Sequence, residues 1–267
     1  MNATTVISPS PQTPDPQTVD LASPLRWLAA GWADLRRNPV PGLVHGCLLA
    51  LFGWILLAVG HNHFWLLAGA FSGFLIVAPI VATGLYHVSR ECYRGRCVGM
   101  REVIGLWRSG DGRLMRFGAL LALAGTGWVL TSAGLITLMS DAPIQKPVDF
   151  VRHVLLNPRV GLFEVWVLMG GLLAAPIFAS SVVAIPMLVD TSMPVTVAVS
   201  QSWRAVADYP LPMVAWALTI AVLMGIGMAT GLIALIVLVP LVAHASWHAY
   251  CDLTSRPHGG HESWPSR

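Results

Sequence analysis

Long stretches without any charged residue divide the chain into apolar segments. Asp, Glu, Lys and Arg are absent from residues 38–89, 117–140, 165–189 and 209–251. A helix needs about 20 apolar residues to cross a bilayer core, so the two middle stretches each fit one crossing. The first and last stretches are about twice that length or more, so each must fold back on itself. The pattern predicts an all-α, polytopic membrane protein with six transmembrane helices.

Turn-forming residues interrupt the two longest stretches. Gly60-His-Asn-His63 interrupts the first, and Ala229-Thr-Gly231 interrupts the last. These turns fix where the outward and return helices meet. We expect six spans at about residues 41–60, 64–88, 114–139, 162–189, 212–229 and 231–252.

Short amphipathic segments precede the pairs of spans. The first begins at Ser23-Pro24, with Ser23 as the helix cap and Pro24 in the first turn. Its apolar residues recur at helical spacing and share one face: Leu25, Leu28, Trp32 and Leu35. We expect this helix to lie along the cytoplasmic surface with that apolar face in the lipid headgroups. Similar helices are predicted at Met100–Ser109 and after Met193-Pro194.

Matching proline motifs indicate an internal repeat. The segment from Pro240 to His248 echoes the one from Pro79 to His87, and Tyr209-Pro-Leu-Pro212 echoes Asn38-Pro-Val-Pro41. The interpretation is three hairpins, each preceded by an interfacial helix, at about residues 23–90, 99–190 and 193–253. The middle copy departs from the pattern, because a longer polar loop joins its two spans. Residues 1–22 and 254–267 are expected to be disordered cytoplasmic tails.

Charge is sparse and lies mainly on one side of the predicted spans. Only 11% of residues are charged, against about 25% in soluble domains, and the net charge is +3. All but three of the 16 Lys and Arg fall on the side of the termini; the exceptions are Lys146, Arg152 and Arg159. The positive-inside rule therefore predicts cytoplasmic termini. Nucleic acid is not an expected partner, because no aromatic stripe accompanies the basic loops.

Several segments together resemble a bacterial integral-membrane family known as domain of unknown function 2189. The segments are Pro24–Trp27 with Asn38-Pro39, Gly73–Tyr86, Pro186–Asp190, Pro210–Trp216 and Pro240–Tyr250. The resemblance extends over about residues 24–253. It implies a six-span protein of the bacterial inner membrane and brings no established activity.

Histidines near the cytoplasmic ends of the spans are the candidate functional residues. His244 and His248 are four residues apart on one helical face, a spacing that can hold a metal or haem. If the repeats pack around one axis, His87 and Asp190 could complete such a site. The alternative is favoured: these histidines bond carbonyls that a proline frees, or they meet headgroups.

No short catalytic motif identifies an enzyme. The sequence holds no H-E-x-x-H, no phosphate-binding glycine loop and no G-x-S-x-G. The favoured function is a non-catalytic accessory or assembly component, with no cofactor, in contact with the bilayer and with other membrane proteins or further copies of itself. The alternative is a transporter or channel for a neutral or apolar small molecule, because repeats and broken spans are typical of transporters. A third hypothesis is metal or haem handling by His244 and His248.

Overall fold

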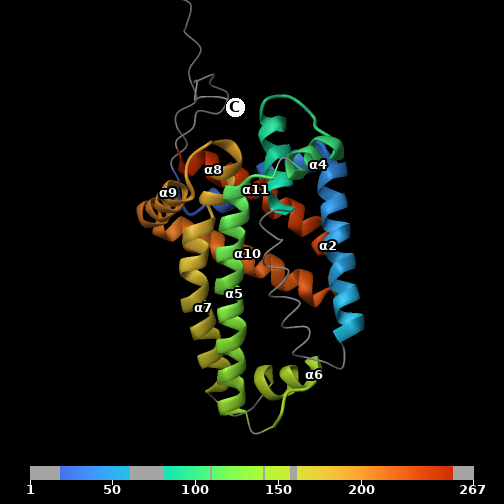
Figure 1. The fold of residues 1–267 in the computed structure, drawn as a ribbon, viewed down its shortest axis with the longest axis vertical. Helices are drawn as coiled ribbons and strands as arrows, with labels where there is room; N and C mark the ends of the chain where they lie inside the picture. The colour runs from blue at the N-terminus through green and yellow to red at the C-terminus, as the bar shows by residue number, and fades with distance from the viewer. Residues whose placement is uncertain (1–18, 61–80, 109, 141, 157–160, 255–267) are drawn as a thin grey trace, which may run out of the picture.

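The computed structural model describes residues 19–60, 81–108, 110–140, 142–156 and 161–254, and all regular elements in these ranges are helices. Figure 1 shows the helices at residues 39–60, 112–139 and 162–181 along the long axis of the molecule, with those at 210–229 and 235–253 oblique to it. The elements are α1 (Ser23–Arg37), α2 (Pro39–Gly60), a helix over residues 81–93, α4 (Met100–Arg108), α5 (Gly112–Met139), α6 (Pro147–Phe150), a π-helical segment (Val151–Leu155), α7 (Leu162–Ser181), α8 (Ala184–Asp190), α9 (Val195–Asp208), α10 (Pro210–Ala229) and α11 (Leu235–Leu253).

Five segments of the described chain are long and apolar enough to cross a membrane. They are Pro39–Gly60, Gly112–Met139, Leu162–Asp190, Pro210–Ala229 and Leu235–Leu253. These match five of the six expected spans to within a few residues. Most of the expected second span, at 64–88, lies outside the described residues, as do nearly all of the two expected tails. The arrangement of six helices in three hairpins therefore stays a prediction.

Helix α11 is the centre of the packing. Every residue from Ala243 to Cys251 is buried, and α11 contacts α1, α2, α8 and α10. Trp27 of α1 packs edge-on against Trp216 of α10, with ring centroids 5.6 Å apart, beside this helix. A helix buried on all sides needs apolar or fully partnered residues around its whole circumference. This explains why the polar residues of α11 make contacts with several neighbouring helices.

Helix α1 packs against α11 through a side that holds few of its large apolar residues. The buried residues are Ser23, Pro24, Trp27, Gly31 and Leu35. Of the predicted apolar face, Leu25 and Trp32 are 69% and 44% exposed and Leu35 is buried, and the contact of this face with lipid headgroups stays a prediction. This buried side lies against α11 because Gly31 lets the two backbones approach, and a count of apolar residues gives no weight to glycine. Ser23 is the first helical residue, and its hydroxyl group bonds Asp20 instead of capping the helix.

Glycines also set the distance between α2 and α11. A Cβ atom at Gly46 would overlap the backbone of Ile236, and one at Gly42 would lie 3.1 Å from Cβ of Pro240. Two glycines four residues apart, as at Gly42 and Gly46, favour close helix packing, and the structure identifies α11 as the partner. Gly231 plays another part, because its φ of 62° supports the turn between α10 and α11.

The fourth span is interrupted near its end. α7 ends at Ser181 and α8 begins at Ala184, where the sequence predicted one continuous helix. Pro186 lies in the first turn of α8, a position that proline tolerates because it needs no intrahelical N–H donor. The backbone N–H of Val183 donates to Ser202 Oγ of α9 at 3.1 Å. The hydroxyl of another helix thus satisfies a buried group at the break.

The loop between α5 and α7 is more structured than the predicted polar loop. It contains α6 and the π-helical segment, which lie at the end of the molecule away from α8 and α9 in Figure 1. Four buried side chains form a separate apolar cluster there: Ile136, Ile144, Val154 and Leu162. The predicted polar loop thus also holds scattered apolar residues, which meet when the segment folds back on α5 and α7.

Candidate functional site

A polar network joins three helices at one end of the molecule. His244 of α11 is fully buried, and its Nδ1 lies 2.7 Å from Ser89 Oγ. The Ser89 hydroxyl donates to Asp34 Oδ2 of α1 at 2.9 Å, and the same carboxylate oxygen lies 2.9 Å from His248 Nε2. We call Asp34, Ser89, His244 and His248 the Asp34 network. It brings together side chains that are up to 214 residues apart in the chain.

The hydrogen-bond geometry assigns the protons of the two histidines. A serine hydroxyl has one proton, and here that proton points to Asp34. His244 therefore carries its proton on Nδ1 and donates it to Ser89 Oγ. Its other ring nitrogen, Nε2, is a buried atom that has no hydrogen-bond partner among the described residues. His248 donates from Nε2 to Asp34, so the carboxylate receives two hydrogen bonds on one oxygen.

Further polar contacts of α11 lie beside this network. Trp27 Nε1 of α1 donates to Asp252 Oδ2 at 2.7 Å, one helical turn beyond His248. Tyr250 donates its hydroxyl proton to Asp190 Oδ2 of α8 at 2.8 Å. His244, His248 and Asp252 recur at intervals of four residues and thus follow one face of α11. This face is the surface to which α1 and the helix at 81–93 are attached.

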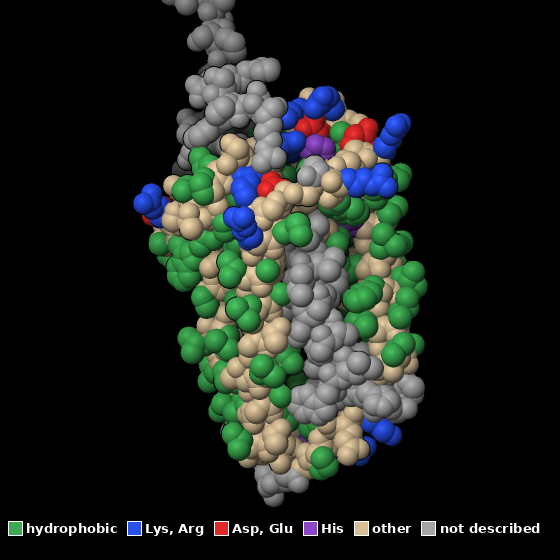
Figure 2. Space-filling view, viewed as in Figure 1, with side chains coloured by type: hydrophobic (Ala, Val, Ile, Leu, Met, Phe, Trp, Pro, Cys, Tyr) green, Lys and Arg blue, Asp and Glu red, His purple; other side chains and the backbone are tan. Residues whose placement is uncertain are grey.

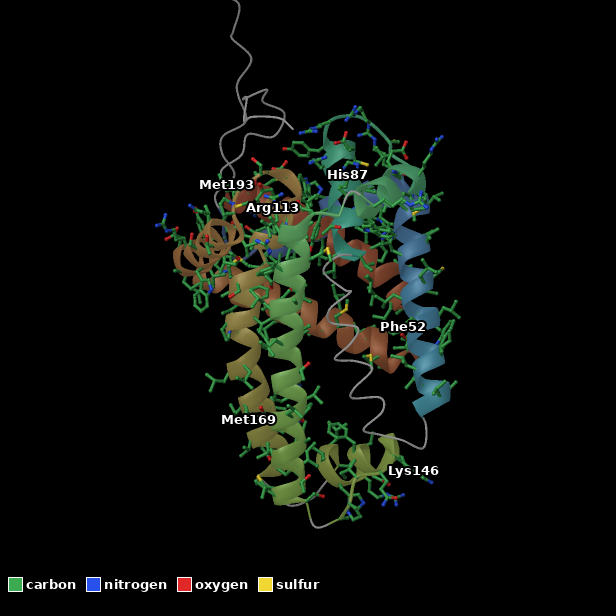
Figure 3. All side chains as sticks on the ribbon, in the orientation of Figure 1. Phe52, His87, Arg113, Lys146, Met169 and Met193 are labelled. Carbon is green, nitrogen blue, oxygen red and sulfur yellow. The ribbon has the colours of Figure 1, made fainter. Side chains whose placement is uncertain are left out.

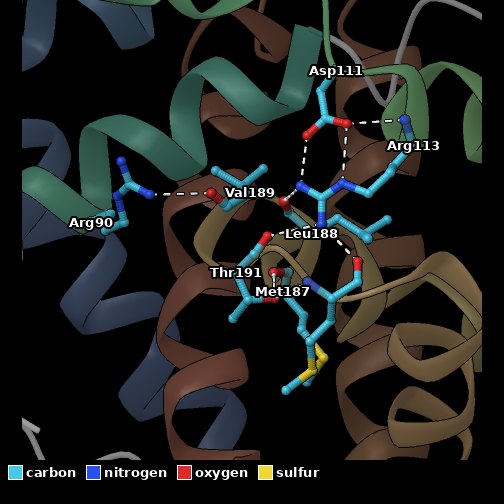
Figure 4. A network of polar contacts seen from close by, with 8 residues as sticks. Arg90, Asp111, Arg113, Met187, Leu188, Val189 and Thr191 are labelled. Carbon is cyan, nitrogen blue, oxygen red and sulfur yellow. Dashed lines mark hydrogen bonds and ion pairs between the residues drawn. The ribbon is translucent and has the colours of Figure 1, made fainter. Parts of the chain in front are cut away.

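His87 makes different contacts from the other two predicted ligands. Its Nδ1 lies 3.0 Å from Nη2 of Arg90, whose Nη1 donates to the carbonyl of Val189 at 3.1 Å (Figure 4). Among the residues that the structure describes, no group of three or more His, Cys, Asp and Glu is placed to hold a metal ion. The structure joins His244 and His248 in one network and pairs His87 with Arg90. Metal binding by these three histidines stays a prediction.

Arg113 fastens the end of α8 to α5. Its guanidinium group forms an ion pair with Asp111 at 2.6 Å and donates to the carbonyls of Leu188, Thr191 and Met193 at 2.6–3.2 Å (Figure 4). These carbonyls lie at and just beyond the C-terminus of α8, where a cation is favoured. Figure 3 places Arg113 and His87 at the same end of the molecule, opposite Lys146. The sequence indicated Arg113 only as a topology signal.

Glu91 is a buried carboxylate that three arginines neutralise. It is 1% exposed and forms ion pairs with Arg90 at 3.3 Å, with Arg94 at 3.2 Å and with Arg96. Burial raises the pKa of Glu91, but the hydrogen bond from Arg96 and the charges of the three guanidinium groups lower it further, so that the pKa ends below its ordinary range. The carboxylate stays ionised and holds the basic loop after residue 93 against the helix.

The sequence reasoning identified the histidines but missed Asp34. The amphipathic pattern of α1 placed Asp34 away from its apolar face, which indicated a solvated side chain. In the structure this carboxylate faces α11 at the edge of the packing interface, with 15% of its side chain exposed. A single acid in the last turn of a helix otherwise rich in arginine was the available signal.

Helices long enough to span a membrane, a basic end and buried polar contacts between helices define a polytopic α-helical integral membrane protein. Residues 66–190 match a family described as "Predicted integral membrane protein (DUF2189)". The resemblance to domain of unknown function 2189 is thereby confirmed over these residues, a shorter range than the sequence motifs had indicated. No match was found among curated proteins or among solved structures.

Proposed function

We propose that this protein is a non-catalytic component of the bacterial inner membrane that acts as an accessory or assembly partner of other membrane proteins. The observation that carries the proposal is that the polar groups of the Asp34 network bond helices of this chain to one another. Its carboxylate and one ring nitrogen of each imidazole form hydrogen bonds between α1, α11 and the helix at 81–93. Such a network rigidifies the fold, and it supports a structural role for the histidines.

Long apolar stretches of the described spans support the same proposal, although α11 carries His244 at its midpoint, where the imidazole is bonded to Ser89. Residues 46–60, 117–139, 165–189, 210–229 and 235–243 contain no His, Asp, Glu, Lys or Arg. A charged solute or a proton relay needs ionisable groups at this depth, which would be costly and functional. The described spans therefore provide surfaces for lipid or protein instead of a path for ions.

Helix α10 presents an exposed apolar stripe that could receive a partner. Leu211, Val214, Leu218, Val222 and Ile226 follow one side of the helix and are 46–65% exposed. Packing between membrane helices depends on van der Waals contact along such sides. We assign this stripe as the first surface to test for a neighbouring membrane protein.

The distribution of charge supports cytoplasmic termini. Figure 2 shows most Lys and Arg side chains at one end of the molecule, above a flank that is largely apolar. The Asp34 network and Arg113 belong to this end. The positive-inside rule favours placing it in the cytoplasm.

Two matching junctions support the proposed repeat. Asn38 separates α1 from α2, and Tyr209 separates α9 from α10, with φ and ψ of −138° and 73° in the first and −127° and 57° in the second. In both, the junction residue donates its N–H to the carbonyl four residues earlier. The same bend therefore joins an amphipathic helix to a span in the first and third copies.

Site-specific photocrosslinking in native membranes tests the proposal. A photoreactive residue at Leu218 on the exposed stripe is expected to form an adduct with one membrane protein, whereas the same residue at the buried Trp216 is the matched control. The identified protein should then form smaller complexes on native gels in a deletion strain, with recovery when the wild-type chain is restored.

A flux assay tests the alternative, a transporter, which the break between α7 and α8 favours. Proteoliposomes that contain the purified protein are expected to pass glycerol and urea no faster than protein-free liposomes. Specific solute flux, or native complexes that are unchanged in the deletion strain, would overturn the proposed role.

A further inference from the structure

A groove runs along the outer face of α1. It is lined by Ala29, Trp32, Ala33, Arg36 and Arg37. We call these five residues the α1 groove. They recur at helical spacing and so share one side of the helix, and all five are exposed. The opposite side carries the residues that pack on α11. The small side chains of Ala29 and Ala33 form the bottom of the groove between the larger side chains of Trp32, Arg36 and Arg37.

The two arginines of the groove carry charge that the described protein does not neutralise. Asp34 is the acidic residue nearest to them on α1, but it is turned toward Ser89 and His248. Arg36 and Arg37 form no ion pair among the described residues, and Arg37 makes one long hydrogen bond, 3.5 Å, to the carbonyl of Cys92. A guanidinium group has five N–H donors, so most donors of this pair remain available to an anion.

The α1 groove lies close to the start of a span, which places it at the depth of the lipid headgroups. Arg37 is separated by one residue from Pro39, where the candidate span α2 begins. Trp32 is 44% exposed, and tryptophan is favoured at the membrane–water interface because its ring is apolar and its N–H is polar. Leu25 and Val40 are 69% and 61% exposed on either side along the chain. The groove thus combines apolar neighbours with two uncompensated cations.

We propose that the α1 groove binds the headgroup of an anionic phospholipid. The guanidinium groups of Arg36 and Arg37 receive the phosphate through charge-assisted hydrogen bonds, which arginine can form in pairs to one phosphate. The indole of Trp32 lies against the glycerol region, and Ala29 and Ala33 leave room for the lipid to reach the helix. Basic sites at the ends of membrane helices favour anionic over zwitterionic lipids by about 1 kcal/mol for each Lys or Arg near the surface.

Lipid retention by the full-length protein tests this site. The protein is extracted from nanodiscs of equal phosphatidylglycerol and phosphatidylcholine, and retained lipids are counted by native mass spectrometry. The wild type is expected to retain phosphatidylglycerol preferentially. The double variant Arg36→Gln with Arg37→Gln should lower that preference by about 30-fold, since two favourable charges are lost. Arg204→Gln on the exposed side of α9 is the matched control and should leave the preference unchanged.

Two further arms keep the proposal falsifiable. Ala33→Leu fills the groove without changing charge, and it should also lower phosphatidylglycerol retention if the variant inserts with wild-type topology. An unchanged preference in both groove variants, or an equal loss in the Arg204→Gln control, overturns the proposal. Displacement of the lipid by inorganic phosphate in phosphatidylcholine-rich discs also overturns it, because a free anion would then be the occupant.

Discussion

Substituting Gly31 with alanine should separate α1 from α11. A Cβ atom at this position would lie 2.6 Å from the backbone nitrogen of Ala245 and 2.9 Å from the carbonyl oxygen of Leu241, whereas ordinary contacts begin near 3.4 Å. Both atoms belong to the helix backbone and cannot rotate away. The helices must therefore move apart by about 0.8 Å, the difference between 3.4 Å and 2.6 Å.

The expected magnitude follows from overpacking and from the contacts that the shift weakens. Extra methyl groups in a tightly packed interface cost about 1–3 kcal/mol. A rigid shift of α1 by the same amount would also lengthen the 2.9 Å contact between Asp34 and His248 to about 3.7 Å, beyond hydrogen-bonding distance. Alanine itself favours helix by about 1 kcal/mol over glycine, which opposes the loss.

A matched control isolates the packing effect. Gly105 lies in the amphipathic helix α4, and a Cβ there would meet nothing within 4 Å. Gly105→Ala gains the same helix propensity without a clash. The difference in free energy of unfolding between Gly31→Ala and Gly105→Ala is therefore expected to be about 1–3 kcal/mol. It can be measured by titrating the purified protein in micelles with SDS and following helix content by circular dichroism. Equal stability of the two variants would refute close packing at Gly31.

Three further predictions concern the polar contacts. Asp34→Asn should destabilise the protein by about 1–3 kcal/mol, and a double-mutant cycle with His248→Ala should give a coupling above about 0.5 kcal/mol in the same titration. Ser202→Ala should cost about 1–3 kcal/mol, because it leaves the buried N–H of Val183 unpaired. The pKa of Glu91 is lowered in the folded protein, so its ionised form stabilises the fold at neutral pH. This contribution is lost as pH falls below about 4.3, the ordinary pKa of glutamate. Glu91→Gln should remove this part of the acid sensitivity when the free energy of unfolding is measured against pH.

Exposed residues of the same type supply the controls for these predictions. Asp208→Asn at the end of α9 and Ser200→Ala on its exposed side should each change stability by less than about 0.5 kcal/mol. Glu102→Gln on α4 should keep the acid sensitivity that Glu91→Gln removes. A loss in the Asp208 or Ser200 control as large as in its partner would contradict a specific role for the network or for the helix break.

The helices of this protein could be located from the sequence, whereas their contacts could not. The five described spans begin and end within a few residues of the predicted limits, and α1, α4 and α9 lie where amphipathic segments were expected. Local composition suffices for this, because a bilayer requires a continuous apolar run and a charged residue ends it. The His244–His248 pair was also visible from its spacing.

The candidate network depended on the tertiary structure. Asp34, Ser89 and His244 come from distant parts of the chain, and each alone resembles an ordinary residue at a helix end. The contact between α1 and α11 could not be predicted from the sequence, because Gly31 contributes to packing by having no side chain.

The sequence by itself determined that this chain belongs in a membrane, how many described segments can cross it and which end is basic. Only the tertiary structure decided which helices touch, where the fourth span breaks and which carboxylate meets the histidines of α11. The physical reason is one of range. Partition into a bilayer depends on about 20 consecutive residues, whereas the contact between His248 and Asp34 depends on how helices 214 residues apart pack together.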